Sequence, residues 1–196
     1  TNSSLIQMDE DSYALAYAGG EGHASWDGYI KTFSVRASDQ VAPTFTAVSL
    51  AADNSTIAVT LDELVFTSSD GSGSLEAGDF ALSISGGTAT LTSATPTSIS
   101  ASGTIYTLGI GLSGTPDGSE VLTVNPLSAA AIYDGSGNAS AASQSNNTVT
   151  LHDQLAPTIS SVTLISNNAT IWVTFSEAVY SAAGTALTAG DFAFSK

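Results

Sequence analysis

The sequence predicts an all-β protein whose central part is a β-sandwich of about seven short strands. Apolar residues occur in short alternating runs, and Gly, Ser, Thr, Ala and Asn fill the segments between them. Alternation is typical of half-buried strands, and small polar residues are typical of turns. An internal repeat of about one domain's length separates the chain into units.

The repeat defines the domain organisation. Residues 39–67 align with residues 153–181 at a constant offset of 114, and 14 of the 29 positions are identical. After a two-residue deletion, LEAGDF at 75–80 matches LTAGDF at 187–192. Solenoid repeats have periods of about 20 to 50 residues, so this unit is a domain. We predict a β-hairpin remnant over residues 1–38, a complete repeat over 39–152 and the N-terminal part of a second repeat over 153–196.

The first unit reads as a hairpin. Strands are expected over residues 5–17 and 29–35, and a glycine-rich loop joins them. Trp26 and His23 lie in this loop. Packing of the aromatic ring on a neighbouring unit is favoured over contact with a glycan.

The complete repeat contains a series of strands, each marked by its own signal. Ile57, Val59 and Leu61 form an inward row after the turn at Asp53 and Asn54. Seven short strands with turn signals between them predict an Ig-like Greek-key sandwich, and a short eighth strand near Ser98 is compatible with the pattern. The expected strands cover residues 44–50, the segment from 57 to 61, then 80–84, 88–91 (returning from a Gly86-Gly87 turn), 105–112, 121–124 and 147–151, with 127–132 as loop.

The charge pattern excludes several classes of partner. The net charge is −15, and no Lys or Arg lies between Arg36 and Lys196. Nucleic acid and anionic membranes are bound by clustered cations, and no apolar run approaches the about 20 residues of a membrane span. We therefore expect no nucleic-acid partner and no membrane insertion. The absence of cysteine excludes disulfides and thiolate metal sites. Most carboxylates of the repeat are expected on a solvated surface.

A subset of the carboxylates is expected to form a metal site. In an Ig-like sandwich the strands alternate in direction, so several loops meet at one pole. Glu63 continues the inward row, and without a basic residue an inward carboxylate must be hydrogen-bonded, protonated or metal-bound. Oxygen ligands suit Ca²⁺. The candidate ligands are Asp39, Glu63, Asp79, Asp134 and Asn138 in the complete repeat, and Asp153 and Glu177, together with Asp191, in the next copy.

A second interpretation involves no metal. Glu63 would accept hydrogen bonds from backbone N–H groups of the loop that follows it, and Asp134 and Asn138 would form a turn.

Several segments together resemble a known repeat family. They are DQxAPT, NxTIxVT, the strand-end Glu, GDF, SGGTATL, LSGTPDGSEVLTV, IYDGSGN and NNTVTL. These motifs are similar to bacterial Ig-like repeats of the SWM or SwmB type, relatives of the Big and cadherin-like modules of large surface proteins. The resemblance covers residues 39–152 fully and 153–196 partly. It implies extracellular placement, tandem spacing, and Ca²⁺ at junctions where a linker Asp precedes Ala-Pro, here Asp39 and Asp153.

The first unit has a resemblance of its own. Residues 1–38 resemble a blade hairpin of propeller-like repeats in marine bacterial surface proteins.

The expected function is structural. We expect a spacer repeat of an extracellular or cell-surface adhesin-like protein, with neighbouring repeats as partners and Ca²⁺ limiting movement between them. No converging catalytic groups are found, so no enzyme is expected. The alternative is a module that binds carbohydrate or another surface through exposed aromatic residues, of which Trp172 is the candidate.

Overall fold

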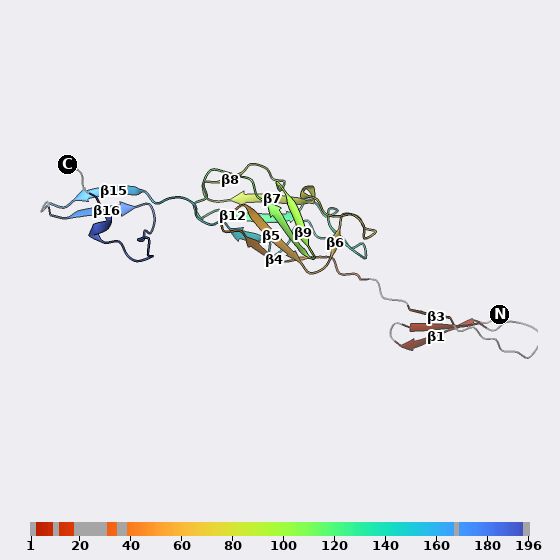
Figure 1. The fold of residues 1–196 in the computed structure, drawn as a ribbon. Helices are drawn as coiled ribbons and strands as arrows, with labels where there is room; N and C mark the ends of the chain where they lie inside the picture. Colours follow the sequence, from red (N-terminus) through yellow and green to blue (C-terminus); the bar gives the residue numbers. More distant parts are fainter. Residues whose placement is uncertain (1–2, 10–11, 18–30, 35–38, 167–168, 194–196) are drawn as a thin grey trace, which may run out of the picture.

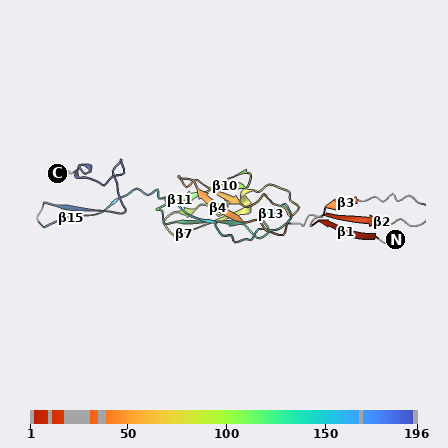
Figure 2. The same ribbon diagram turned by 90° about the horizontal axis from the view of Figure 1, so that it is seen from below.

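Strands dominate the structure, which confirms the predicted all-β class. A sandwich built from residues 39–152 lies between two smaller antiparallel sheets, one toward each end of the chain (Figure 1, Figure 2). Two one-turn 3-10 helices, Ala77–Asp79 (η1) and Ala189–Asp191 (η2), are the other regular elements of the described residues. The structure is a computed structural model that describes residues 3–9, 12–17, 31–34, 39–166 and 169–193.

The first sheet of the sandwich has the strand order β4-β5-β10-β9, with antiparallel neighbours. Its inward row is the predicted one, because Ile57, Val59 and Leu61 are all buried. The fourth strand, β9, is the short strand that the pattern near Ser98 allowed. The bounds are β4 (Phe45–Leu50), β5 (Thr56–Leu61), β9 (Ile99–Ser102) and β10 (Ile105–Gly109).

The second sheet has the order β14-β12-β7, again antiparallel. If the seven main strands are lettered A to G along the chain, the two sheets read A-B-E-D and G-F-C. A four-stranded and a three-stranded antiparallel sheet are consistent with the predicted β-sandwich. The strands are β7 (Phe80–Ser85), β12 (Val121–Pro126) and β14 (Thr148–Thr150).

Two short ladders complete the sandwich, and one of them corrects the predicted strands. The segment expected to return from Gly86-Gly87 forms only β8 (Thr90–Leu91), which pairs with β11 (Leu112–Ser113). The single strand expected over 105–112 is therefore divided into β10 and β11. Gly109 and Gly111 lie at the division, where a Cβ atom would collide with the side chains of Thr97, Ser98 and Thr92. The other ladder joins β6 (Val65–Phe66) to β13 (Tyr133–Asp134).

The core lies between the two sheets. Phe80 is in ring contact with Phe45 and with Tyr106, at centroid distances of 6.3 and 6.1 Å. Fully buried aliphatic residues from both sheets and from the segment before β13 belong to the same core cluster, and burial of apolar surface is the main stabilising contribution. They include Ile57, Val59, Leu108, Leu122, Val124 and Ile132.

The N-terminal unit differs from the predicted hairpin. It is a sheet of three strands, β1 (Ser3–Asp9), β2 (Ser12–Tyr17) and β3 (Lys31–Ser34), in that order. The long strand predicted over 5–17 is two antiparallel strands. The acidic residues between Met8 and Ser12 interrupt the apolar pattern of the sequence, and the prediction did not use this break. His23 and Trp26 lie outside the described residues.

The second repeat copies the start of the first. Strands β15 (Ile159–Leu164) and β16 (Ile171–Phe175) form an antiparallel hairpin. A register irregularity follows Ile159, at the position equivalent to Phe45 in β4. Within the described part of this repeat, no further strand is present.

Candidate metal centre

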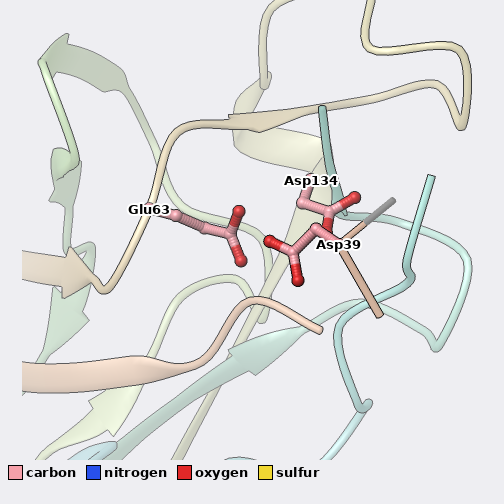
Figure 3. Close-up of side chains that lie close together, drawn as sticks. All are labelled: Asp39, Glu63 and Asp134. Carbon is pink, nitrogen blue, oxygen red and sulfur yellow. The ribbon is translucent and has the colours of Figure 1, made fainter. Parts of the chain in front are cut away.

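Three carboxylates meet at the N-terminal end of the sandwich, and we call them the carboxylate cluster. Asp39 precedes β4, Glu63 follows β5, and Asp134 ends β13. One ligand oxygen from each lies within 4.8 Å of the other two. Figure 3 shows the three side chains converging from separate segments of the chain. The sequence prediction that these residues share one pole is therefore correct.

Asp134 is positioned by the ladder between β6 and β13 and by its own turn. Asp134 lies opposite Val65 in the ladder, and Val65 is two residues after Glu63 in the sequence. Its Oδ1 accepts the backbone N–H groups of Ser136 and Asn138, both over 2.8 Å. Aspartate commonly organises a turn in this way. The carboxylate is completely buried.

Asn138 connects the buried carboxylate to the linker. Its Nδ2 donates to Asp134 Oδ2 over 2.6 Å and to the carbonyl oxygens of Asp39 and Val41 over 2.9 and 3.3 Å. The amide nitrogen of Asn138 therefore faces the cluster, and its role is to position Asp39 and Asp134. Asp62 attaches the linker to the end of β5 at a second point, because its carboxylate accepts the N–H and the hydroxyl of Thr44.

The electrostatics of Glu63 reflect this crowding. Desolvation raises the pKa of its carboxyl group, and the nearby charges of Asp134, Asp39 and Asp62 raise it further. No hydrogen bond from the following loop offsets these effects. The interpretation of Glu63 as an acceptor for that loop is therefore not supported, whereas Asp134 does form a turn. Binding of a proton or a cation to the Glu63 carboxylate is therefore favoured.

The pKa of Asp134 is shifted in the opposite direction to that of Glu63. Desolvation raises its pKa, but hydrogen bonds from Asn138 and Ser136 outweigh this effect, and the pKa of Asp134 lies below its ordinary value. The carboxylate is therefore charged although it is buried. Oδ1 accepts the N–H groups of Ser136 and Asn138, and Oδ2 accepts the side-chain amide of Asn138.

The donor set fits a hard cation. Three carboxylates provide oxygen ligands only, and the described part of this repeat contains no Lys or Arg to neutralise them. Ca²⁺ takes six to eight oxygen ligands in flexible geometry, and water and backbone carbonyls commonly complete the set. Mg²⁺ requires stricter octahedral geometry.

Asp79 is not a member of the carboxylate cluster. Its Oδ2 accepts the backbone N–H of Glu76 over 2.7 Å, at the start of η1. Asp191 makes the same contact with Thr188 over 2.7 Å in the second repeat. The conserved GDF segment thus forms a capped helical turn in both copies, a role that the metal prediction overlooked.

Asp153 and Glu177 reproduce part of the cluster in the second repeat. Asp153 Oδ1 accepts the N–H of Leu155 over 2.8 Å, as Asp39 Oδ1 does from Val41 over 2.9 Å. Desolvation raises the pKa of Glu177, as do the charge of Asp153 and a hydrogen bond with it. The two carboxylates are therefore neighbours, as their counterparts are.

Glu120 is buried, and it is therefore an exception to the expectation that most carboxylates of the repeat lie on a solvated surface. Its oxygens accept the backbone N–H groups of Thr88, Ala89, Asp117 and Gly118 over 2.9 to 3.3 Å. Desolvation raises its pKa, but these hydrogen bonds outweigh it and lower the pKa overall. Glu120 lies two residues before the buried Leu122, and this alternation was the signal that could have revealed it.

Comparison of the chain with models of protein families, with curated proteins and with solved structures gave no match. Among the described residues, no helix is long and apolar enough to span a membrane.

Proposed function

We propose that the chain is a structural segment of tandem Ig-like repeats, a spacer in a large extracellular or cell-surface adhesin-like protein. The observation that carries this proposal is the recurrence of one local structure in two successive units. In each unit a linker Asp lies beside a Glu that follows the second strand. The partners of each repeat are then the neighbouring repeats, and no catalytic role is assigned.

The linker is attached in the same way in both units, which supports a spacer role. Thr44 N–H donates to Asp62 over 2.8 Å, and the equivalent Thr158 N–H donates to Ser176 over 2.9 Å. A spacer requires a defined direction of the chain at each junction, and side chains that hold the linker provide it.

We further propose that the carboxylate cluster binds Ca²⁺. Binding would neutralise three carboxylates at the point where the linker meets the sandwich. The ion would also connect Asp39, which lies on the linker, to Glu63 and Asp134, which lie on the sandwich. Flexing of the linker at this point would then be restricted.

Small-angle scattering of the full chain, in EDTA and in millimolar Ca²⁺, tests both proposals. We expect a narrower distribution of interatomic distances with Ca²⁺, because the linker is fixed to the sandwich. A Glu63→Gln variant should respond much less. Identical profiles of the wild-type chain in the two buffers would contradict a Ca²⁺-stiffened spacer.

A second candidate function rests on Trp172. This side chain is 67% exposed and lies on the face of β16 opposite to Ile171 and Val173. Exposed tryptophan rings are suited to carbohydrate contacts. The equivalent residue of the first repeat is Ala58, so a binding platform would belong to the second repeat alone.

A further inference from the structure

The buried carboxylate of Glu120 joins two loops that take no part in the carboxylate cluster. From one loop it accepts the backbone N–H groups of Thr88 and Ala89, both over 2.9 Å. From the other it accepts those of Asp117 and Gly118 over 3.1 to 3.3 Å. The two loops belong to the SGGTATL and LSGTPDGSEVLTV segments of the sequence. The carboxylate cluster gives neither segment a role.

The second of these loops, residues 114–119, is held at several points, and we call it the exit loop. Besides the hydrogen bonds to Glu120, Thr88 Oγ1 donates to the Thr115 carbonyl oxygen over 3.0 Å. Gly87 lies so close to Glu120 that a Cβ atom there would overlap the carboxylate. A buried carboxylate is costly unless it is hydrogen-bonded, so the charge of Glu120 favours this one conformation of the exit loop.

The exit loop contacts the chain where it leaves the sandwich. Residues 152–154 begin the connection to the second repeat, and we call them the exit linker. Gln154 N–H donates to the Pro116 carbonyl oxygen over 2.9 Å. Gly118 packs against Asp153, because a Cβ atom at Gly118 would lie 3.1 Å from the Asp153 Cβ atom. The conformation of the exit loop therefore affects the path of the exit linker.

The turn between β4 and β5 is a second attachment of the exit linker. Asn54 and His152 exchange two hydrogen bonds, over 2.8 and 2.9 Å. Gln154 Nε2 donates to the Ala52 carbonyl oxygen over 3.3 Å. A segment attached at one point can pivot about it, whereas two attachments define a direction. Loss of the exit loop as an attachment would leave the linker held by this turn alone.

We propose that Glu120 is a positioning residue for the second repeat. Its carboxylate fixes the exit loop, and the exit loop fixes the direction in which the exit linker leaves the first repeat. This inference rests on the spacer function proposed above and adds to it an attachment that requires no metal. The carboxylate cluster would act where a linker enters a repeat, and Glu120 acts where the next linker leaves it.

Amide hydrogen exchange of the full chain, at neutral pH in EDTA, tests the proposal. The amide of Glu120→Gln cannot accept hydrogen bonds from both loops. We therefore expect the Gln154 amide to exchange at least about tenfold faster relative to the Val59 amide, which lies in the centre of the first sheet. Ile57→Val lowers the stability of the core without a change in the exit loop, so it should leave this ratio unchanged.

The distance between two spin labels shows whether the connection between the repeats loosens. The chain contains no cysteine, so Ser100→Cys and Thr163→Cys place one label at an exposed position of each repeat. In EDTA, we expect Glu120→Gln to broaden the distribution of label distances and Ile57→Val to leave it unchanged. An unchanged exchange ratio in Glu120→Gln, or label distances distributed as in the wild type, would overturn the proposal. Failure of Ca²⁺ binding cannot produce either result, because no Ca²⁺ is present.

A second variant covers the case in which Glu120→Gln does not fold. Thr88→Val removes the hydroxyl that holds the Thr115 carbonyl oxygen and retains the buried carboxylate with its N–H partners. We expect the Gln154 amide to exchange several-fold faster relative to the Val59 amide, because the exit loop has lost one hydrogen bond. An unchanged ratio in this variant would also overturn the proposal, since the exit loop would then not hold the exit linker.

Discussion

Asn54 and His152 are joined by two reciprocal hydrogen bonds. Asn54 Nδ2 donates to the His152 carbonyl oxygen over 2.8 Å, and the His152 backbone N–H donates to Asn54 Oδ1 over 2.9 Å. The pair ties the turn between β4 and β5 to the segment after β14, where the chain leaves the sandwich. Gln154 N–H adds a hydrogen bond to the Pro116 carbonyl oxygen over 2.9 Å. The start of the next linker is thus attached to the sandwich by hydrogen bonds.

Replacement of Asn54 separates these hydrogen bonds from its backbone conformation. Asn54 has a φ of 58°, in the left-handed region. Asn54→Gly retains that conformation but loses both hydrogen bonds, so we expect a loss of about 1–2 kcal/mol in the free energy of unfolding. Asn54→Ala should lose about 1 kcal/mol more, because a Cβ atom disfavours this φ. Urea unfolding measures both, and unchanged stability of the glycine variant would contradict this role.

Glu120→Gln should destabilise the sandwich at neutral pH. The amide places an NH₂ donor among backbone N–H groups that have only the Glu120 oxygens as partners. A buried donor left without an acceptor costs about 1–3 kcal/mol. Urea unfolding of the full chain measures the loss, and equal stability of the two chains would show that these N–H groups find other acceptors.

The pH dependence of that loss follows from the lowered pKa of Glu120. A carboxylate whose pKa is lowered by folding adds stability above its ordinary pKa, and this contribution disappears as the pH falls through the lowered value. The difference between wild type and Glu120→Gln should therefore shrink in acid. A difference that stays constant down to acidic pH would argue against a charged Glu120.

In the absence of metal, the pH dependence of stability due to Glu63 is opposite to that due to Glu120. Folding raises its pKa, so its contribution to stability is fully present below the ordinary glutamate pKa and is lost as the pH rises through the raised value. In EDTA at neutral pH, Glu63→Gln should be more stable than wild type, by less than about 1 kcal/mol because the group is partly exposed. The gain should vanish in acid. Thermal melts across this pH range measure it, and a less stable variant in EDTA would contradict carboxylate repulsion.

Trp172→Ala tests the alternative function. If the chain is a spacer, screening against a panel of glycans and cell surfaces should give the same result for the variant and the wild type. Binding by the wild type that the variant loses would establish recognition through Trp172. Trp26→Ala is the parallel variant in the first unit.

The sequence predicted the sandwich well because its signals are local. The alternation of Ile57, Val59 and Leu61 and the turn at Asp53-Asn54 needed no knowledge of distant residues. The convergence of Asp39, Glu63 and Asp134 was also predictable, because antiparallel topology brings those loops to one pole. Asp79 was assigned to the same group, but a capping contact within its own segment, with Glu76, holds its side chain.

The features that were missed depend on contacts between distant segments. The alternation of Glu120 with Leu122 indicates an inward side chain, but the N–H groups of Thr88 and Ala89 that stabilise its charge lie about 30 residues away and cannot be read from the local sequence. The division of the predicted strand at Gly109 depends on the close approach of Thr97 and Ser98. The short ladder of Val65 with Asp134 joins segments too short to show periodicity.

Thermal unfolding of the full chain in EDTA and in millimolar Ca²⁺ tests the central claim most directly. Binding at a hundredfold excess over Kd adds about 2.7 kcal/mol, so we expect the transition of the sandwich to rise by about 10 °C. Glu63→Gln should lose most of this increase, whereas Glu177→Gln, the equivalent change outside the three-carboxylate cluster, should retain it. An unchanged transition of the wild-type chain, or an equal increase in Glu63→Gln, would contradict a Ca²⁺ site formed by Asp39, Glu63 and Asp134.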